Sequence, residues 1–175
     1  MRLLAISGSL RSDSSNSSLI RAVASLTPES VDVHIFSGLA ELPFFNPDLD
    51  VGLGPTAVAH FREAIQKADA VLISSPEYAH GVPGVLKNAL DWLVGSGELI
   101  DKPVALVNAA PRATHAYASL METLITMTAR IVHEASITVA VSGRLRNEHE
   151  ICADPTVAPA LRKALATLCQ VNRSI

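Results

Sequence analysis

The chain alternates between short apolar runs and longer stretches in which an apolar residue recurs every three or four positions. Short runs of this kind are typical of strands, and the longer periodicity is typical of helices. Strands are expected at 2–7, 31–36, 69–75, 103–110 and 134–141. Helices are expected at 16–27, 55–68, 83–95, 116–130 and 154–171. Pro55 suits a first helical position, and Asp154 suits a helix cap.

Strands that alternate with helices predict a parallel, doubly wound α/β sheet. No repeat or linker divides the 175 residues, so a single domain over 1–175 is expected. In sheets of this class, ligands bind beyond the carboxyl ends of the strands. The loops most relevant to function are therefore those that follow the first, third and fourth strands, at 7–15, 75–82 and 108–115.

Composition and charge narrow the classes of partner. The formal net charge is −3 and no element carries a cluster of lysine and arginine, so nucleic acid is not an expected partner. No run of about 18 apolar residues occurs, and the N-terminus lacks the apolar region of a secretory signal, so no membrane association is expected. Cys152 and Cys169 form no CxxC pair and are expected to be free thiols. These features predict a cytoplasmic protein.

The loop after the first strand, SGSLRSDSSN, is rich in hydrogen-bond donors and leads into a helix. The N–H groups and the positive end of a helix favour an anion at this place. The chain has neither a GxxxxGK[ST] loop nor a GxGxxG fingerprint, so a phosphate monoester is the predicted ligand. The alternative is that the serines only cap the helix, but capping occupies one or two side chains. The donor side chains are Ser9, Arg11, Ser12, Ser14, Ser15 and Asn16.

The stretch SSPEYAHGVPGVLKNALDWL predicts a wall for a flat ligand. Pro76 and Pro83 stiffen the loop, and Gly81 permits close approach of the backbone. Tyr78 supplies an aromatic face. A loop tyrosine on its own is more often a surface residue, but beside a phosphate site it becomes a candidate ring contact.

These two segments together resemble a known family. GSLRSDSSN is similar to the GSxRxxSxN phosphate loop of the flavodoxin-like NADPH-dependent FMN reductases, and SPEYAHGVPGVLKNALDWL is similar to their PEYNxSxPGxLKNAIDW segment. The resemblance implies a flavodoxin-like five-stranded parallel sheet in the order 2-1-3-4-5, with helices on both faces. It implies that the FMN phosphate is held by Ser9, Arg11, Ser14 and Asn16. We expect the neighbouring donor Ser15 to bind the cofactor with them. It also implies that the isoalloxazine ring is bordered by Pro76, Glu77, Tyr78, Ala79 and Gly81.

The chain departs from the family pattern at two places. Asparagine commonly follows the PEY triplet in the family, whereas Ala79 stands here, so a side-chain hydrogen bond is lost and a backbone contact remains. The third loop is often glycine-rich in the family, whereas this chain has NAAPRATHA at 108–116. We expect Ala110 to present its backbone to the flavin, and Arg112 to help hold a pyridine nucleotide or an acidic substrate.

The resemblance implies an FMN-dependent NAD(P)H oxidoreductase. NADPH or NADH would pass a hydride to flavin N5, and the flavin would then reduce a small acceptor such as a quinone, a free flavin, an azo compound or a metal oxyanion. The cofactor carries this chemistry, so no catalytic side chain is assigned. Two alternatives stay open: an electron carrier of flavodoxin type, and a non-catalytic FMN-binding module.

Motifs for other chemistries are incomplete. The His-Glu pair at 133–134 is followed by Ile137 where HExxH requires a second histidine, and no GxSxG elbow occurs. No metal site is therefore expected. His80 and His115 fall in the two loops expected beside the ring, where each is either a solvated residue or a substrate contact.

The irregular stretch 38–54 bears on assembly. It contains two adjacent aromatic residues, Phe44 and Phe45. Long loops in compact domains are usually functional, and exposed aromatic residues mark contact surfaces. We expect a homodimer, or a tetramer of two such dimers, in which the partner helps enclose the flavin site. The alternative is that both phenylalanines fold back onto their own sheet.

Overall fold

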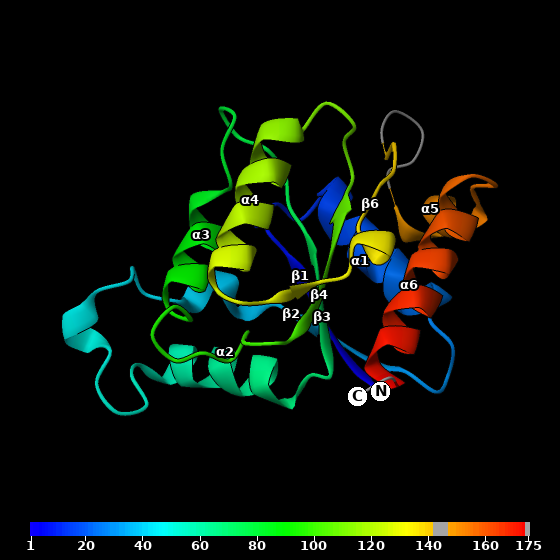
Figure 1. Cartoon of the computed structure of the whole chain (residues 1–175). Coiled ribbons are helices and arrows are strands. Elements are labelled where there is room, and N and C mark those ends of the chain that lie inside the picture. The colour runs from blue at the N-terminus through cyan, green and yellow to red at the C-terminus, as the bar shows by residue number, and fades with distance from the viewer. Residues whose placement is uncertain (142–146, 174–175) are drawn as a thin grey trace.

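A parallel sheet forms the centre of the computed structural model, which describes residues 1–141 and 147–173 (Figure 1). The strand order is β2-β1-β3-β4-β5, and the short β6 also pairs with β4. This is the predicted flavodoxin-like order. The strands are β1 (Arg2–Ser7), β2 (Asp32–Phe36), β3 (Ala70–Ser74), β4 (Pro103–Asn108), β5 (Arg130–Ile131) and β6 (Ile137–Thr138).

Helices cover both faces of the sheet (Figure 1). Helices α1, α5 and α6 pack on one face, and α2, α3 and α4 pack on the other. Their bounds are α1 (Ser15–Leu26), α2 (Thr56–Lys67), α3 (Gly84–Asp91), α4 (Thr114–Thr126), α5 (Glu148–Ala153) and α6 (Val157–Arg173). No helix within the described ranges is both long and apolar enough to cross a membrane.

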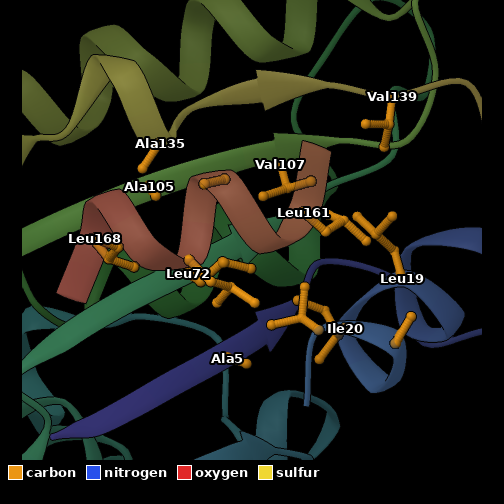
Figure 2. Close-up of a cluster of buried hydrophobic side chains, with 14 of the residues drawn as sticks. Ala5, Leu19, Ile20, Leu72, Ala105, Val107, Ala135, Val139, Leu161 and Leu168 are labelled. Atoms are coloured by element: carbon orange, nitrogen blue, oxygen red, sulfur yellow. The ribbon is translucent and has the colours of Figure 1, made fainter. Parts of the chain in front are cut away.

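The central strands are apolar along their whole length because they are buried on both faces. In β1, Leu3 and Ala5 point into the core under α1 and α6, whereas Leu4 and Ile6 point into the core under α2 and α3. Figure 2 shows the first of these cores, in which side chains of α1 and α6 lie over strand residues such as Ala5, Leu72 and Val107. Alternation therefore distributes one apolar run between two cores.

The predicted strand at 134–141 is wrong in part. The chain instead forms β5, the short 3₁₀ helix η3 (His133–Ala135) and β6. The hydroxyl of Ser136 accepts the Leu106 N–H at 3.1 Å and donates to the Val132 carbonyl at 2.9 Å. A side chain thus occupies a ladder position that a backbone carbonyl would fill in a continuous strand, and the strand is interrupted there.

The predicted helix at 154–171 is the second of two helices. The additional helix, α5, begins with a capping box, in which the Asn147 side chain accepts the Glu150 N–H at 3.0 Å and the Glu150 carboxylate accepts the Asn147 N–H at 3.2 Å. Asp154 is confirmed as a cap, because its carboxylate accepts the N–H groups of Thr156 and Val157, each at 2.9 Å.

The irregular segment 38–54 is fixed to α3 by side chains of that helix and its C-cap. It includes two 3₁₀ turns, η1 (Gly38–Glu41) and η2 (Pro47–Leu49). Trp92 Nε1 and Asn88 Nδ2 both donate to the Pro43 carbonyl, at 2.9 and 3.0 Å. Asn88 Oδ1 accepts the Phe45 N–H at 2.8 Å. The Asn and Trp of the LKNALDW stretch therefore anchor this segment.

An ion pair fixes the far part of the same segment. Arg62 Nη2 donates to both carboxylate oxygens of Asp50, at 2.8 and 3.0 Å, and to the Trp92 carbonyl at 2.6 Å. The two charged side chains are 12% and 21% exposed. Loss of one partner from such a pair leaves a largely buried charge, which is costly.

We expect Asp50→Ala to lower the free energy of unfolding by about 2 kcal/mol, because Arg62 would lose its directly hydrogen-bonded carboxylate in a mostly buried place and keep only the longer ion pair with Glu98, at 3.9 Å. Urea unfolding followed by circular dichroism measures this change. Lys67→Ala is the matched control, because it removes the exposed ion pair between Lys67 and Glu63 on α2 and should leave the midpoint unchanged. Equal effects of the two substitutions would contradict an anchoring role for the Asp50 pair.

Candidate functional site

The candidate site lies at the carboxyl edge of the sheet, toward the top of Figure 1. Strands β1 and β3 are parallel neighbours, and their last residues, Ser7 and Ser74, stand opposite each other. The chain crosses directly from β1 over the end of β3, where the Gly8 N–H donates to the Ser74 carbonyl at 2.8 Å. A Cβ at Gly8 would lie 3.0 Å from Leu86 Cδ2 and from Ser75 Oγ. Only glycine fits there without a shift of these neighbours.

The serine-rich loop uses its hydroxyls first to organise itself. Ser14 caps α1, where its Oγ accepts the Ser17 N–H at 3.4 Å. The Oγ of Ser9 accepts the Arg11 N–H at 3.3 Å. Both serines are buried. A hydroxyl that accepts a hydrogen bond still has its own hydrogen to donate. Ser9 and Ser14 therefore each retain a donor for an acceptor outside the loop.

Asn16 completes the donor set in the first turn of α1. Its side chain is buried, and Oδ1 accepts the hydroxyl hydrogen of Ser74 at 2.8 Å. This bond orients the amide and leaves Nδ2 as a donor. The first N–H groups of a helix have no acceptor within the helix, and no acidic residue lies in this turn. The helix end thus presents several donors and a favourable dipole to an anion.

The other predicted phosphate ligands lie on the surface beside this helix end. Arg11 and Ser15 are exposed, as is the acidic Asp13. Arg11 is the cationic side chain that the loop itself supplies. The structure therefore brings Ser9, Ser14 and Asn16 together, with Arg11 at the rim.

The second loop makes a tight two-residue turn. Tyr78 and Gly81 form an antiparallel bridge, with N–H to carbonyl distances of 3.1 and 2.9 Å. The two residues between them, Ala79 and His80, have φ angles of +49° and +61°. Turns of this shape favour asparagine and glycine because other residues are strained at positive φ. The asparagine common at position 79 in the resembled family is thus explained by backbone conformation as well as by a side-chain contact.

Most of the predicted ring-side residues are accessible in this loop. Tyr78 is 55% exposed, Ala79 is exposed, and Pro76 and Gly81 are half-buried. Glu77 is also half-buried, but its carboxylate is engaged: Oε2 accepts the Ala116 N–H at 2.8 Å. Glu77 therefore contributes to the wall through its position rather than through a free carboxylate.

The third loop is held by Asn108, which is buried. Its Oδ1 accepts the Ala110 N–H at 3.0 Å, and its Nδ2 donates to the Ala113 carbonyl at 3.1 Å. The Ala110 carbonyl accepts the Ala113 N–H at 2.9 Å. Both backbone groups of Ala110 are therefore used within the loop, while Arg112 is exposed.

The second and third loops touch each other. The rings of His80 and His115 are stacked, with centroids 4.3 Å apart and an interplanar angle of 21°. Tyr117 of α4 lies behind these loops, beside Ser75 and Asn108, where the remaining cavity is only about 10 Å³. Burial raises the pKa of the Tyr117 phenol, and a hydrogen bond to Ser136 partly offsets this rise. The two loops thus form one closely packed wall.

Several residues that organise the site were not anticipated from the sequence. Three of the four share one signal, because they are the polar residues that end buried apolar strands: Ser7, Ser74 and Asn108. The fourth, Ser17, lies in α1, and its hydroxyl is 2.9 Å from that of Ser7. A polar residue at the carboxyl end of a buried strand is therefore informative even when it does not contact a ligand.

A larger cavity lies at the opposite end of the sheet. It has a volume of about 610 Å³ and is lined by residues of the N-terminus, the α1–β2 connection and α6, among them Met1, Leu26, Arg162 and Leu165. It is at the amino ends of the strands. Ligands of doubly wound sheets bind at the carboxyl ends, so the loops rather than this cavity are the candidate site.

Comparison with known proteins identifies relatives of this arrangement. Residues 1–143 match the family model described as NADPH-dependent FMN reductase. An NAD(P)H-dependent FMN reductase of Pseudomonas aeruginosa is 38% identical over 112 residues, which cover 63% of this chain and 60% of that protein. An NADPH:quinone oxidoreductase of Arabidopsis thaliana is 43% identical over 112 residues, which cover 62% of this chain and 57% of that protein. The matched segments therefore span somewhat more than half the length of these relatives.

A solved structure extends the likeness to the whole fold. FerB, a flavoenzyme NAD(P)H:(acceptor) oxidoreductase from Paracoccus denitrificans, superposes with a TM-score of 0.82 at 25% identity. The superposition covers 99% of this chain and 97% of that one.

We expect Ala79→Asn to raise the free energy of unfolding by about 0.5 kcal/mol, because asparagine tolerates positive φ better than alanine does. The control is Ala118→Asn at an exposed position of α4, where asparagine is a poorer helix former and should lower stability. Urea unfolding of the three proteins measures both effects. A loss of stability in Ala79→Asn would show that the turn conformation is not the reason for the asparagine preference.

Proposed function

The chain belongs to the NADPH-dependent FMN reductase family, and we propose that it binds FMN at the carboxyl edge of its sheet and transfers electrons from NADPH or NADH to a small acceptor. The observation that carries this proposal is the set of donors left by the serine-rich loop. Ser9, Ser14 and Asn16 each use their acceptor atom inside the protein and keep a hydrogen to donate. Such a set favours a ligand group that accepts hydrogen bonds and donates none.

A phosphate monoester fits these donors. It carries nearly two negative charges and three terminal oxygens at neutral pH. The donors lie at the first turn of α1, and Arg11 can add a charge-assisted hydrogen bond from the rim. We assign Ser9, Arg11, Ser14, Ser15 and Asn16 to the phosphate.

The second and third loops supply the ring side. The turn at Tyr78 and Ala79 exposes an aromatic face and backbone groups to a flat ligand. We assign Pro76, Glu77, Tyr78, Ala79 and Gly81 to this wall, together with Ala110 of the third loop. We assign the exposed Arg112 to a pyridine nucleotide or an acidic substrate. FMN, when bound, supplies the hydride and electron transfer, and the protein supplies orientation and exclusion of water.

The names of the relatives support a quinone or a free flavin as the acceptor. We propose this class of small, conjugated ring compound that accepts two electrons for the present chain. A one-electron carrier of flavodoxin type would bind FMN but oxidise NAD(P)H slowly, and a non-catalytic binding module would not oxidise it at all. Steady-state oxidation of NADPH and NADH, with a quinone as the electron acceptor, distinguishes the reductase from the electron carrier and the binding module.

We expect wild-type protein to quench FMN fluorescence on titration, and Arg11→Ala to weaken binding about tenfold, because a charge-assisted bond to the phosphate is lost. Riboflavin, which lacks the phosphate, should bind wild type more weakly than FMN does. Arg162→Ala, an exposed substitution on α6, is the control and should bind as wild type does. Absence of FMN binding by the wild type at tens of micromolar would refute the proposal.

We further propose that the chain forms a homodimer through the segment 38–54. Its exposed apolar residues are Phe44, Leu49, Val51 and Leu53, and Phe44 is 91% exposed. Phe45 instead folds back, with its ring edge-on to Trp92 at 5.1 Å. The hydrogen bonds of Trp92 and Arg62 hold the segment in place before any partner binds. A preordered apolar surface suits a second copy of this chain.

Sedimentation velocity at micromolar concentration should show a dimer for the wild type and a monomer for the double variant Phe44→Asp, Val51→Asp, because two charges would be buried in the interface. Ala166→Asp on the exposed face of α6 is the control and should remain a dimer. A wild-type monomer at this concentration would exclude the dimer, and a tetramer would indicate that dimers pair.

We propose a reducing compartment, the cytoplasm, for this chain. Cys152 and Cys169 are not joined by a disulfide. Burial raises the pKa of the Cys152 thiol, which keeps it in the less reactive protonated form.

A further inference from the structure

We propose that Glu77 is a positioning residue that, together with the stacked pair His80 and His115, ties the first turn of α4 to the second loop and so fixes the ring-side wall. We call this set of contacts the α4 brace. The role in ligand binding rests on the proposed function, because the ligand of the wall is FMN. The contacts of the brace are properties of the protein without ligand.

Helix α4 has no side-chain cap of its own. Its N-cap residue is Ala113, which cannot accept a hydrogen bond through its side chain. The carboxylate of Glu77 takes this role from a position 39 residues earlier in the chain, at 2.8 Å from the Ala116 nitrogen. A carboxylate at this place also interacts favourably with the positive end of the helix. The helix end and the second loop therefore stabilise each other.

The histidine pair provides a second contact in the same turn of α4, one residue before Ala116. His115 precedes Ala116 in α4, and its ring stacks on His80 at 4.3 Å. Glu77 and His80 flank Tyr78 and Ala79 in the second loop. Tyr78 and Ala79, two of the five residues predicted to border the flavin ring, thus lie between two points that both contact α4.

The region between these points needs such support. The turn contains two residues at positive φ, and Tyr78 is 55% exposed. A strained, exposed turn keeps its shape only when its surroundings hold it. Without the brace, FMN would have to order the turn on binding, and that ordering would reduce its affinity.

The test compares Glu77→Ala with the isosteric Glu77→Gln. The control is Glu122→Ala, which removes an exposed glutamate of α4. Hydrogen exchange of the Ala116 amide, measured by NMR in the protein without FMN, reports the brace directly. We expect exchange about tenfold faster in Glu77→Ala, because the amide loses its acceptor. Glu77→Gln keeps an acceptor oxygen and should restore most of the protection.

FMN affinity, measured by fluorescence quenching on the same proteins, reports the positioning role. We expect a loss of about tenfold in Glu77→Ala, near-wild-type binding in Glu77→Gln and no change in Glu122→Ala. His115→Ala removes the stack but keeps the carboxylate bond, so affinity should fall severalfold while the Ala116 amide stays protected. If Glu77→Ala does not fold, the FMN affinity of His115→Ala tests the positioning role in its place.

Unchanged exchange at Ala116 in Glu77→Ala would show that the brace contact is absent. Faster exchange of the Ala116 amide in Glu77→Ala with unchanged FMN affinity would show that Glu77 only caps the helix, and it would overturn the positioning role. A wild type that binds no FMN would overturn the proposed function together with the positioning role, and the exchange data would then show separately whether the brace exists.

Discussion

The parallel pairing of β1 with β3 is the constraint on which the candidate site depends. Because Ser7 stands opposite Ser74, both strands end at the same level, and the two loops that follow must leave the sheet side by side. Gly8 permits the start of the first loop to pack closely against Ser75 and Leu86. The Ser74 hydroxyl then reaches Asn16 at the start of α1. A shift of one residue in this pairing would separate the donors that the loop brings together.

Polar residues at the strand ends have an architectural role that leaves the ligand-binding atoms available. Ser74 and Asn108 are buried and hydrogen-bonded within the protein, so they orient the loops without competing for a ligand. Ser9 and Ser14 accept from backbone N–H groups and keep their own hydrogens. The donors of this loop are therefore ordered by the protein itself, and ordering of this kind lowers the entropic cost of binding a ligand.

Much of the fold was accessible from the sequence because its dominant signal is local. The continuous apolar runs of β1, β3 and β4 follow directly from burial on both faces. The residue types of the serine-rich loop predict an anion site, and the structure shows how Ser9, Ser14 and Asn16 are oriented there. The features that could not be predicted depend on partners distant in the chain. Ser136 interrupts a strand by bonding to Leu106, 30 positions away, and Glu77 bonds to a backbone N–H that has no sequence signature. The positive φ of Ala79 could not be predicted either, because alanine is not a residue type that favours positive φ.

The long-range cap on α4 also bears on how the chain folds. Most helices carry the signal for their first turn within a few residues, so that turn can form early and independently. The first turn of α4 depends instead on a carboxylate 39 residues earlier, and closing a loop of that length has an entropic cost before the bond can form. We expect the amino end of α4 and the loop after β3 to become structured together and late, after β3 and β4 have paired. The carboxyl edge of the sheet would then be the last part of the molecule to become structured.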